Sequence, residues 1–114
     1  YKAGLKVAMG NFGALHSAAA VPIAMGTDTG PPARFQGYFE HRELQLMVDA
    51  GMSPLAAIRS ATGLAADCIG MSDLGTLEPG RWADFSVLSA DPTENIANTK
   101  TIESVYIAGN RVAD

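Results

Sequence analysis

The feature that most constrains this chain is a short apolar run that ends at an aspartate. Residues 21–27 read Val-Pro-Ile-Ala-Met-Gly-Thr, and Asp28 follows them directly. The run is too short for a helix and does not alternate with polar residues, which is typical of a parallel strand covered on both faces. We therefore predict a buried strand in an α/β fold, with Asp28 at the edge where such folds gather ligands and catalytic groups.

Asp28 also has a simpler interpretation. Aspartates in loops commonly accept hydrogen bonds from nearby backbone N–H groups and so stabilise a turn. Spacing alone favours neither role. Prolines and glycines interrupt residues 28–38, so we expect this stretch to form an irregular loop after the strand.

Helical periodicity is found on both sides of the strand and loop. Apolar residues recur at three- and four-residue spacing from residue 2 to about residue 20, and again from about His41 to a stop at Gly51. Ser53-Pro54 is a strong start signal for a further helix, because serine caps the first turn and proline fits its first position. Thr62 is expected to cap one more turn, which Gly70 ends.

The pattern changes to β after Gly70. Glu78-Pro79-Gly80 suits a tight turn, residues 84–88 and 102–108 are strand candidates, and Gly109-Asn110 is a hairpin signal before Arg111-Val112. About three strands form a poor independent core. We therefore expect them to complete a sheet whose other strands lie outside this chain.

Composition excludes several classes of protein. The chain has 114 residues, a formal net charge of −4 and no basic stripe, which argues against binding to nucleic acid or to a membrane surface. Its single cysteine, Cys68, excludes an internal disulfide and is expected to be buried on an apolar helical stripe. Only 18% of residues are charged whereas 47% are hydrophobic, so we expect faces that are buried against a second copy or a further part of the protein.

The tripeptide Asp28-Thr29-Gly30 permits a remote alternative. It matches the short signature of aspartic proteases, and a chain of this length could be half of a dimer in which two such aspartates share a proton. That fold is almost entirely β, whereas residues 41–69 are predicted to be helical. The protease is therefore disfavoured.

Five segments in series resemble the C-terminal third of metal-dependent amidohydrolases, closest to the imidazolonepropionase-like and Xaa-Pro dipeptidase-like branch. They occur in the family's order and spacing, and the resemblance extends from about Leu15 over nearly all the remaining chain. The segments are residues 21–28, 41–44, 50–54, 61–66 and 75–84.

The resemblance implies a C-terminal fragment of a (β/α)₈ TIM barrel. Residues 1–69 would contain the last strand and its flanking helices, and residues 70–114 would supply strands of a small composite β-sandwich. Asp28 corresponds to the aspartate that ends strand eight, which in this family binds the catalytic zinc or other divalent metal and accepts a proton from the attacking water. The implied reaction is hydrolysis of amide, cyclic amide or peptide C–N bonds in a small-molecule or dipeptide substrate.

Most of the family's histidines have no counterpart in this chain. Its only two are His16, expected to be a surface or packing residue, and His41, for which a structural role is favoured. We retain His41, Arg34 and Tyr38 as weaker candidates for substrate contact. Because a catalytic zinc site keeps three protein ligands, Asp28 cannot hold the metal alone. We expect this chain to be inactive by itself; the alternative is a non-catalytic module that oligomerises or docks onto the rest of its barrel.

Three further residues are expected to have structural roles. Glu43 should support the loop or pair with a neighbour such as Arg42, Trp82 should pack, and Asp84 should orient the backbone before the first sandwich strand. A start at Tyr1 instead of methionine leads us to expect an upstream segment. Any targeting signal would precede Tyr1, so the sequence indicates no compartment.

Overall fold

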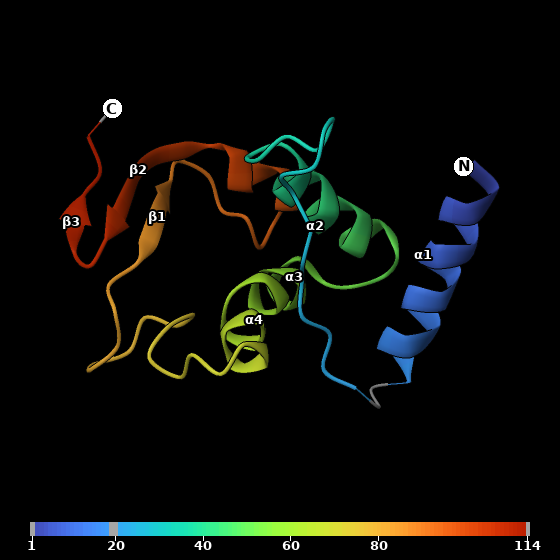
Figure 1. The fold of residues 1–114 in the computed structure, drawn as a ribbon, viewed down its shortest axis with the longest axis horizontal. Helices are drawn as coiled ribbons and strands as arrows, with labels where there is room; N and C mark the ends of the chain where they lie inside the picture. The colour runs from blue at the N-terminus through green and yellow to red at the C-terminus, as the bar shows by residue number, and fades with distance from the viewer. Residues whose placement is uncertain (1, 19–20, 114) are drawn as a thin grey trace.

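A computed structural model describes residues 2–18 and 21–113, and it forms an elongated molecule of 44 × 30 × 30 Å. Figure 1 shows α1 at one end, the β-strands at the other and the remaining α-helices between them. The Cα radius of gyration is 14.9 Å, above the value of about 13 Å expected for a compact chain of this length. The elements, in order, are α1 Lys2–Ser17, α2 Phe39–Asp49, α3 Pro54–Ala61, α4 Gly63–Cys68, β1 Phe85–Leu88, the 3₁₀-helix η1 Ile96–Lys100, β2 Ile102–Ile107 and β3 Asn110–Arg111.

The core lies where α2, α3 and η1 meet. Its buried side chains are joined by partly buried residues of α1 and of the segment before Asp28, among them Phe12, Ile23 and Met25. This small core therefore supports the segment that carries Asp28. The buried hydrophobic residues of the cluster are Leu44, Met47, Met52, Ala57 and Ile96.

The predicted strand at residues 21–27 is wrong for this chain. The segment is extended, but it belongs to no described strand, and Ile23 and Met25 are only partly buried. Two hydrogen bonds attach it to α3 instead: the Met25 N–H donates to the Ser60 carbonyl oxygen, and the Ser60 hydroxyl donates to the Ile23 carbonyl oxygen. A parallel strand needs neighbouring strands to complete its backbone hydrogen bonds, and none of the described strands lies beside it.

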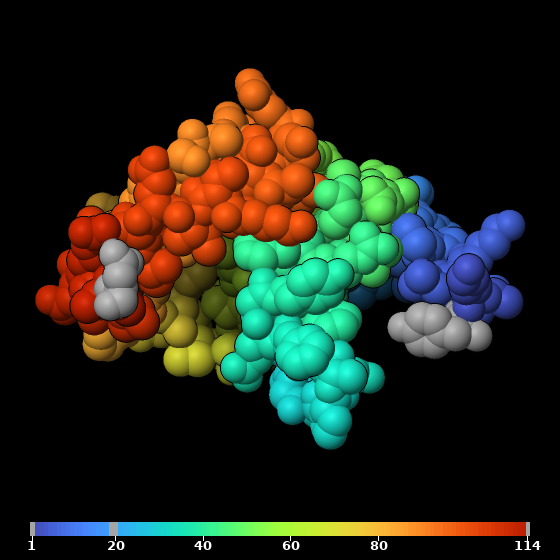
Figure 2. All heavy atoms as spheres, turned by 90° about the horizontal axis from the view of Figure 1, so that it is seen from above, coloured from blue at the N-terminus to red at the C-terminus, as the bar shows by residue number. Residues whose placement is uncertain are grey.

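Helix α1 packs loosely at the edge of the molecule. It has no fully buried residue, and its side chains Leu5, Val7 and Leu15 are exposed. It ends at Ser17 in the described part of the chain, so the predicted end near residue 20 lies outside that part. Figure 2 shows α1, in blue, at one end of the surface. No helix among the described residues is long and apolar enough to cross a membrane.

The helix signals around Gly51 and Ser53 are confirmed. Gly51 has a φ of +107° after α2, and the Met52 N–H donates to the Met47 carbonyl oxygen, which closes a Schellman motif. The Ser53 hydroxyl accepts a hydrogen bond of 3.2 Å from the Ala56 N–H, and Pro54 opens α3. Helix α2 begins at Phe39, two residues before the predicted start.

One prediction about α4 holds in part and one is wrong. Thr62 occupies the N-cap position of α4, but its hydroxyl donates to the Ile58 carbonyl oxygen at 2.8 Å and accepts no hydrogen bond from the helix. A threonine hydroxyl one turn beyond a carbonyl readily bonds back to it, which removes it from capping. Cys68 is exposed, because this six-residue helix buries only Ala66.

The three strands form an antiparallel sheet in the order β1-β2-β3. Phe85 pairs with Tyr106 across β1 and β2, and their rings stack with centroids 4.6 Å apart. The hairpin prediction is wrong by one residue: Ile107 pairs with Asn110, so the two loop residues are Ala108 and Gly109. Both have positive φ values, as a type I′ turn requires.

The turns that lead into β1 keep most of their predicted features. The Arg81 N–H donates to the Glu78 carbonyl oxygen and Gly80 has a φ of +91°, which confirms the turn at residues 78–80. Asp84 does orient backbone, but that of the β2–β3 turn and not of the turn before β1: its Oδ1 accepts from the Ala108 N–H at 2.7 Å. Trp82 differs from the prediction: it is 53% exposed and is held by its Nε1–H, which donates to Asp73 at 2.8 Å.

Gly75 allows the closest backbone approach in this part of the molecule. Its φ is +83°, and a Cβ placed on it would lie 2.7 Å from the Thr62 carbonyl oxygen and 2.9 Å from the Gly63 Cα. Gly70 has a similar φ of +75°, but a Cβ there would meet nothing within 4 Å. Alanine substitutions at the two positions therefore distinguish two causes of lost stability: a left-handed backbone at both glycines, and a steric clash of the new Cβ at Gly75 alone.

We predict that Gly75→Ala destabilises the fold more than Gly70→Ala. Gly70→Ala should cost about 1–2 kcal/mol, because only the left-handed backbone is penalised. Gly75→Ala should cost a further ~1–3 kcal/mol, because the start of α4 must also move. Urea denaturation of both variants gives the comparison, and equal losses would contradict this account of the loop before β1.

Candidate functional site

Asp28 lies in the irregular loop that follows the extended segment. Its φ of +50° is uncommon for a residue other than glycine, and its side chain is 82% exposed. Figure 2 shows the stretch around residues 30–38, in cyan, projecting from the body of the molecule. The predicted irregular loop is thus confirmed, and Asp28 presents its carboxylate at the surface of this chain.

Of the three candidates for substrate contact, Arg34 is the one that contacts Asp28 in the described part of the chain. The Arg34 Nη1 lies 2.8 Å from the Asp28 Oδ2 and donates also to its carbonyl oxygen at 3.3 Å. Two backbone bonds fold the loop so that this contact forms: the Gly30 N–H donates to the Arg34 carbonyl oxygen, and the Arg34 N–H donates to that of Pro31. Both side chains are at least half exposed, so water screens the ion pair and it contributes little stability.

Tyr38 and His41 have different surroundings. Tyr38 is exposed, and its ring meets that of Phe39 edge to face at 5.2 Å. The Nδ1 of His41 lies 2.9 Å from the hydroxyl oxygen of Thr99, which donates its own proton to the Ile96 carbonyl oxygen. We therefore assign the proton to Nδ1, and this contact connects α2 to η1.

Glu40 is the site residue that sequence reasoning missed. Its Oε1 accepts hydrogen bonds from the hydroxyls of Thr29 at 2.7 Å and Thr27 at 3.4 Å, and its Oε2 accepts from the Gly37 N–H at 2.7 Å. The hydrogen bond from Thr29 is the largest of several contacts that lower the pKa of Glu40. No local pattern in the sequence identifies Glu40, because Thr29 and Thr27 lie 11 and 13 residues before it in the chain.

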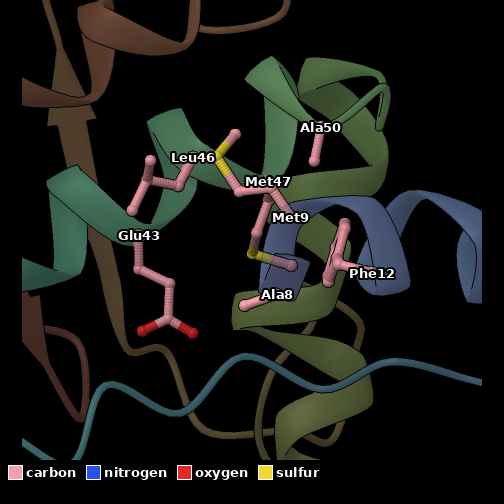
Figure 3. Close-up of a pocket in the computed structure, with 7 residues that line it drawn as sticks. All are labelled: Ala8, Met9, Phe12, Glu43, Leu46, Met47 and Ala50. Carbon is pink, nitrogen blue, oxygen red and sulfur yellow. The ribbon is translucent and has the colours of Figure 1, made fainter. Parts of the chain in front are cut away.

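Glu43 contacts the segment before Asp28, which differs from the prediction that it supports the loop after Asp28 or pairs with Arg42. Its Oε1 accepts a hydrogen bond of 3.4 Å from the Gly26 N–H. Figure 3 shows its carboxylate pointing toward the extended segment and away from Met9 and Phe12. The hollow beside it, about 270 Å³, lies between α1 and α2, and apart from Glu43 its lining is apolar. We attribute this hollow to the loose packing of α1.

The described residues do not form a metal centre by themselves. Nowhere in residues 2–18 and 21–113 do three His, Cys, Asp or Glu side chains gather in a geometry that could hold an ion. His16 stacks on Phe12 with ring centroids 6.4 Å apart, so it packs as predicted. The donor set of this chain therefore offers the Asp28 carboxylate without the two further ligands that a catalytic zinc needs.

Comparison with known protein families identifies the family of this chain. Residues 7–112 match the model of the amidohydrolase family, and the chain belongs to this family. The match includes the extended segment, Asp28, all the helices after it and the sheet. The helical middle of the chain also agrees with this family better than with the nearly all-β aspartic protease alternative.

Several named proteins are similar to the chain in sequence. An adenine deaminase of Sinorhizobium fredii is 36% identical over 94 residues, which cover 81% of this chain and 15% of that protein. An imidazolonepropionase of Deinococcus deserti is 33% identical over 98 residues, 82% of this chain and 24% of that protein. The similarity to imidazolonepropionase confirms the branch of the family that the sequence resembles. The adenine deaminases are further relatives that the sequence analysis did not name.

Solved structures agree with the sequence comparison. The chain superimposes on a putative prolidase of Bifidobacterium longum with a TM-score of 0.84 and 35% identity, over 93% of this chain and 26% of that one. Phenylurea hydrolase B gives a TM-score of 0.82 and 34% identity, over 90% of this chain and 26% of that one. The chain thus spans between 15% and 26% of the length of these four relatives.

We predict that Glu40 makes the stability of the loop depend on pH on the acid side. Because folding lowers the pKa of Glu40 below its ordinary value of 4.5, the ionised carboxylate stabilises the folded chain above that pH. This stabilisation is lost as the pH falls below 4.5 and passes through the folded pKa. Glu40→Gln should remove it.

The measurement is urea denaturation of the wild type and of Glu40→Gln between about pH 3 and about pH 7. The stability difference between the two should be largest at neutral pH and shrink toward the acid end. Thr29→Val, which removes the largest cause of the pKa shift, should reduce the same pH dependence. A difference that stays constant over this pH range would contradict the prediction.

Proposed function

We propose that this chain supplies the Asp28 carboxylate to the active site of a larger enzyme that hydrolyses C–N bonds. Membership of the amidohydrolase family supports the proposal, as does the position of Asp28 directly after an extended segment, on an exposed loop. The exposed aspartate at the end of residues 21–27 is the observation that carries it. The rest of the protein would provide the remaining barrel strands beside this segment.

Asp28 has two roles in this proposal. Its carboxylate accepts a proton from the water that attacks the substrate, since a carboxylate within hydrogen-bond distance of water can act as a general base. It is also one oxygen ligand of the zinc or other divalent ion that the family relationship implies. The described residues do not fit a complete ligand set, so the other ligands would come from elsewhere in the protein.

The proposed substrate is a small molecule or a dipeptide. The names of the relatives indicate adenine, imidazolonepropionate and phenylurea as substrates of those proteins, and one related structure is described as an Xaa-Pro dipeptidase. Arg34 would contact the substrate from the loop, because its guanidinium already lies against the Asp28 carboxylate. Tyr38, exposed near the end of the same loop, is a second candidate, whereas the hydrogen bond of His41 to Thr99 favours a structural role.

The exposed apolar surface supports a second proposal, that the chain acts as a module that docks onto other parts of the protein. A groove of about 710 Å³ separates the α3–α4 region from the sheet, and Leu77, Phe85 and Tyr106 are among the residues that line it. A three-stranded sheet is stable only when it has a hydrophobic face or packs against a helix. The proposed occupant of this surface is the remainder of the same sheet and barrel, since the relatives are several times longer than this chain.

The first test replaces Asp28 in the complete protein that contains this segment. Asp28→Asn should lower kcat for a C–N bond substrate by about 10²-fold or more, because the amide keeps the shape of the side chain but cannot accept the proton. Asp67→Asn is the matched control, since Asp67 is exposed on α4. A variant Asp28→Asn that keeps more than about half of the wild-type rate would contradict the general-base role.

The second test uses the 114-residue chain with added Zn²⁺. We expect no hydrolysis of adenine or of an Xaa-Pro dipeptide, substoichiometric zinc after dialysis, and association at micromolar concentration in sedimentation experiments. A stable monomer would argue against the docking module. Hydrolysis that Asp28→Asn abolishes would overturn the expectation that the chain is inactive alone.

A further inference from the structure

We propose that Glu40 is a positioning residue that holds Asp28 in place without touching it. The Glu40 carboxylate accepts hydrogen bonds from both neighbours of Asp28, Thr27 and Thr29, and from Gly37 at the far end of the loop. The inference rests on the proposed function, since it concerns the same aspartate. It assigns to Glu40 a role that neither the sequence pattern nor the similarity to known proteins supplies.

The hydrogen bonds of Glu40 bracket Asp28 on both sides. The Thr29 hydroxyl donates to the Oε1 of Glu40 at 2.7 Å and the Thr27 hydroxyl at 3.4 Å. The two threonine hydroxyl oxygens also lie 3.3 Å from each other. Both neighbours of Asp28 therefore contact α2, while the Asp28 side chain pairs with Arg34.

The second oxygen of Glu40 closes the loop at its other end. The Gly37 N–H donates to the Oε2 of Glu40 at 2.7 Å. Glu40 itself lies in the first turn of α2, one turn before the buried Leu44, which anchors that helix in the core. The carboxylate is thus fixed by a rigid element and holds both ends of residues 27–37.

The backbone conformation of Asp28 explains why these hydrogen bonds are needed. A left-handed φ of +50° at a residue with a Cβ persists only where the surroundings over-determine it. The ion pair with Arg34 cannot supply this constraint, because both side chains are largely exposed and such pairs contribute little. The hydrogen bonds from Thr27 and Thr29 to Glu40 can supply this constraint, because Glu40 lies on a packed helix.

The experiment compares variants of the complete protein by steady-state kinetics. Glu40→Ala and Thr29→Val should lower kcat about tenfold or more while KM changes less than about twofold, because the group that reacts is misplaced and substrate binding is kept. Thr29→Ser should retain most of the wild-type kcat, since its hydroxyl can still donate to Glu40. Asp49→Asn is the matched control: Asp49 ends the same helix and accepts its hydrogen bond from Gln45.

Amide hydrogen exchange gives a readout that does not depend on activity. In Glu40→Ala the amide of Gly37 should exchange faster, because its acceptor is removed. The amide of Met52, which donates to Met47 at the end of α2, should be unchanged. If Glu40→Ala fails to fold, the comparison of Thr29→Val with Thr29→Ser decides the matter alone.

The outcomes separate this inference from the proposed function. Loss of activity in Asp28→Asn with full activity in Glu40→Ala would overturn only the positioning role. Full activity in Asp28→Asn would overturn the proposed function and with it any catalytic consequence of Glu40. Unchanged exchange at Gly37 in Glu40→Ala, or equal kcat values for Thr29→Val and Thr29→Ser, would overturn the inference whatever Asp28 does.

Discussion

The packing of α2 is the constraint on which the surroundings of Asp28 depend. One face of this helix buries Leu44 and Met47 in the core. Other positions on the helix direct polar side chains at three separate segments: Glu40 reaches the Asp28 loop, Glu43 reaches the extended segment and His41 reaches η1. Because a helix repeats every 3.6 residues, a single packed element can order several stretches of chain that would otherwise have few contacts.

The features that could be predicted from sequence are those fixed by a few neighbouring residues. Ser53 and Pro54 start a helix through their own cap and first-turn geometry. Gly51 ends one because it adopts a positive φ that other residues avoid. Asp28 could also be located, since its place after an apolar run at the start of a Gly- and Pro-rich loop is a local pattern.

The features that could not be predicted depend on distant partners. The extended segment at residues 21–27 has the composition of a buried strand, but strand pairing is set by other strands, and the described chain gives it none. Cys68 has a helical apolar pattern, yet burial requires something to pack on it. Glu40 meets Thr29 and Thr27 from 11 and 13 residues away, which no local periodicity encodes. The hairpin shifted by one residue because the register of β2 and β3 decides which residues turn.

The contact between His41 and Thr99 bears on how the helical part of the molecule is connected to the sheet. Since the Thr99 hydroxyl gives its proton to Ile96, the His41 ring must donate from Nδ1. The 3₁₀-helix η1 leads directly into β2, which is the middle strand of the sheet. The helix that holds the Asp28 loop is therefore joined, through one side-chain hydrogen bond, to the segment that begins the central strand.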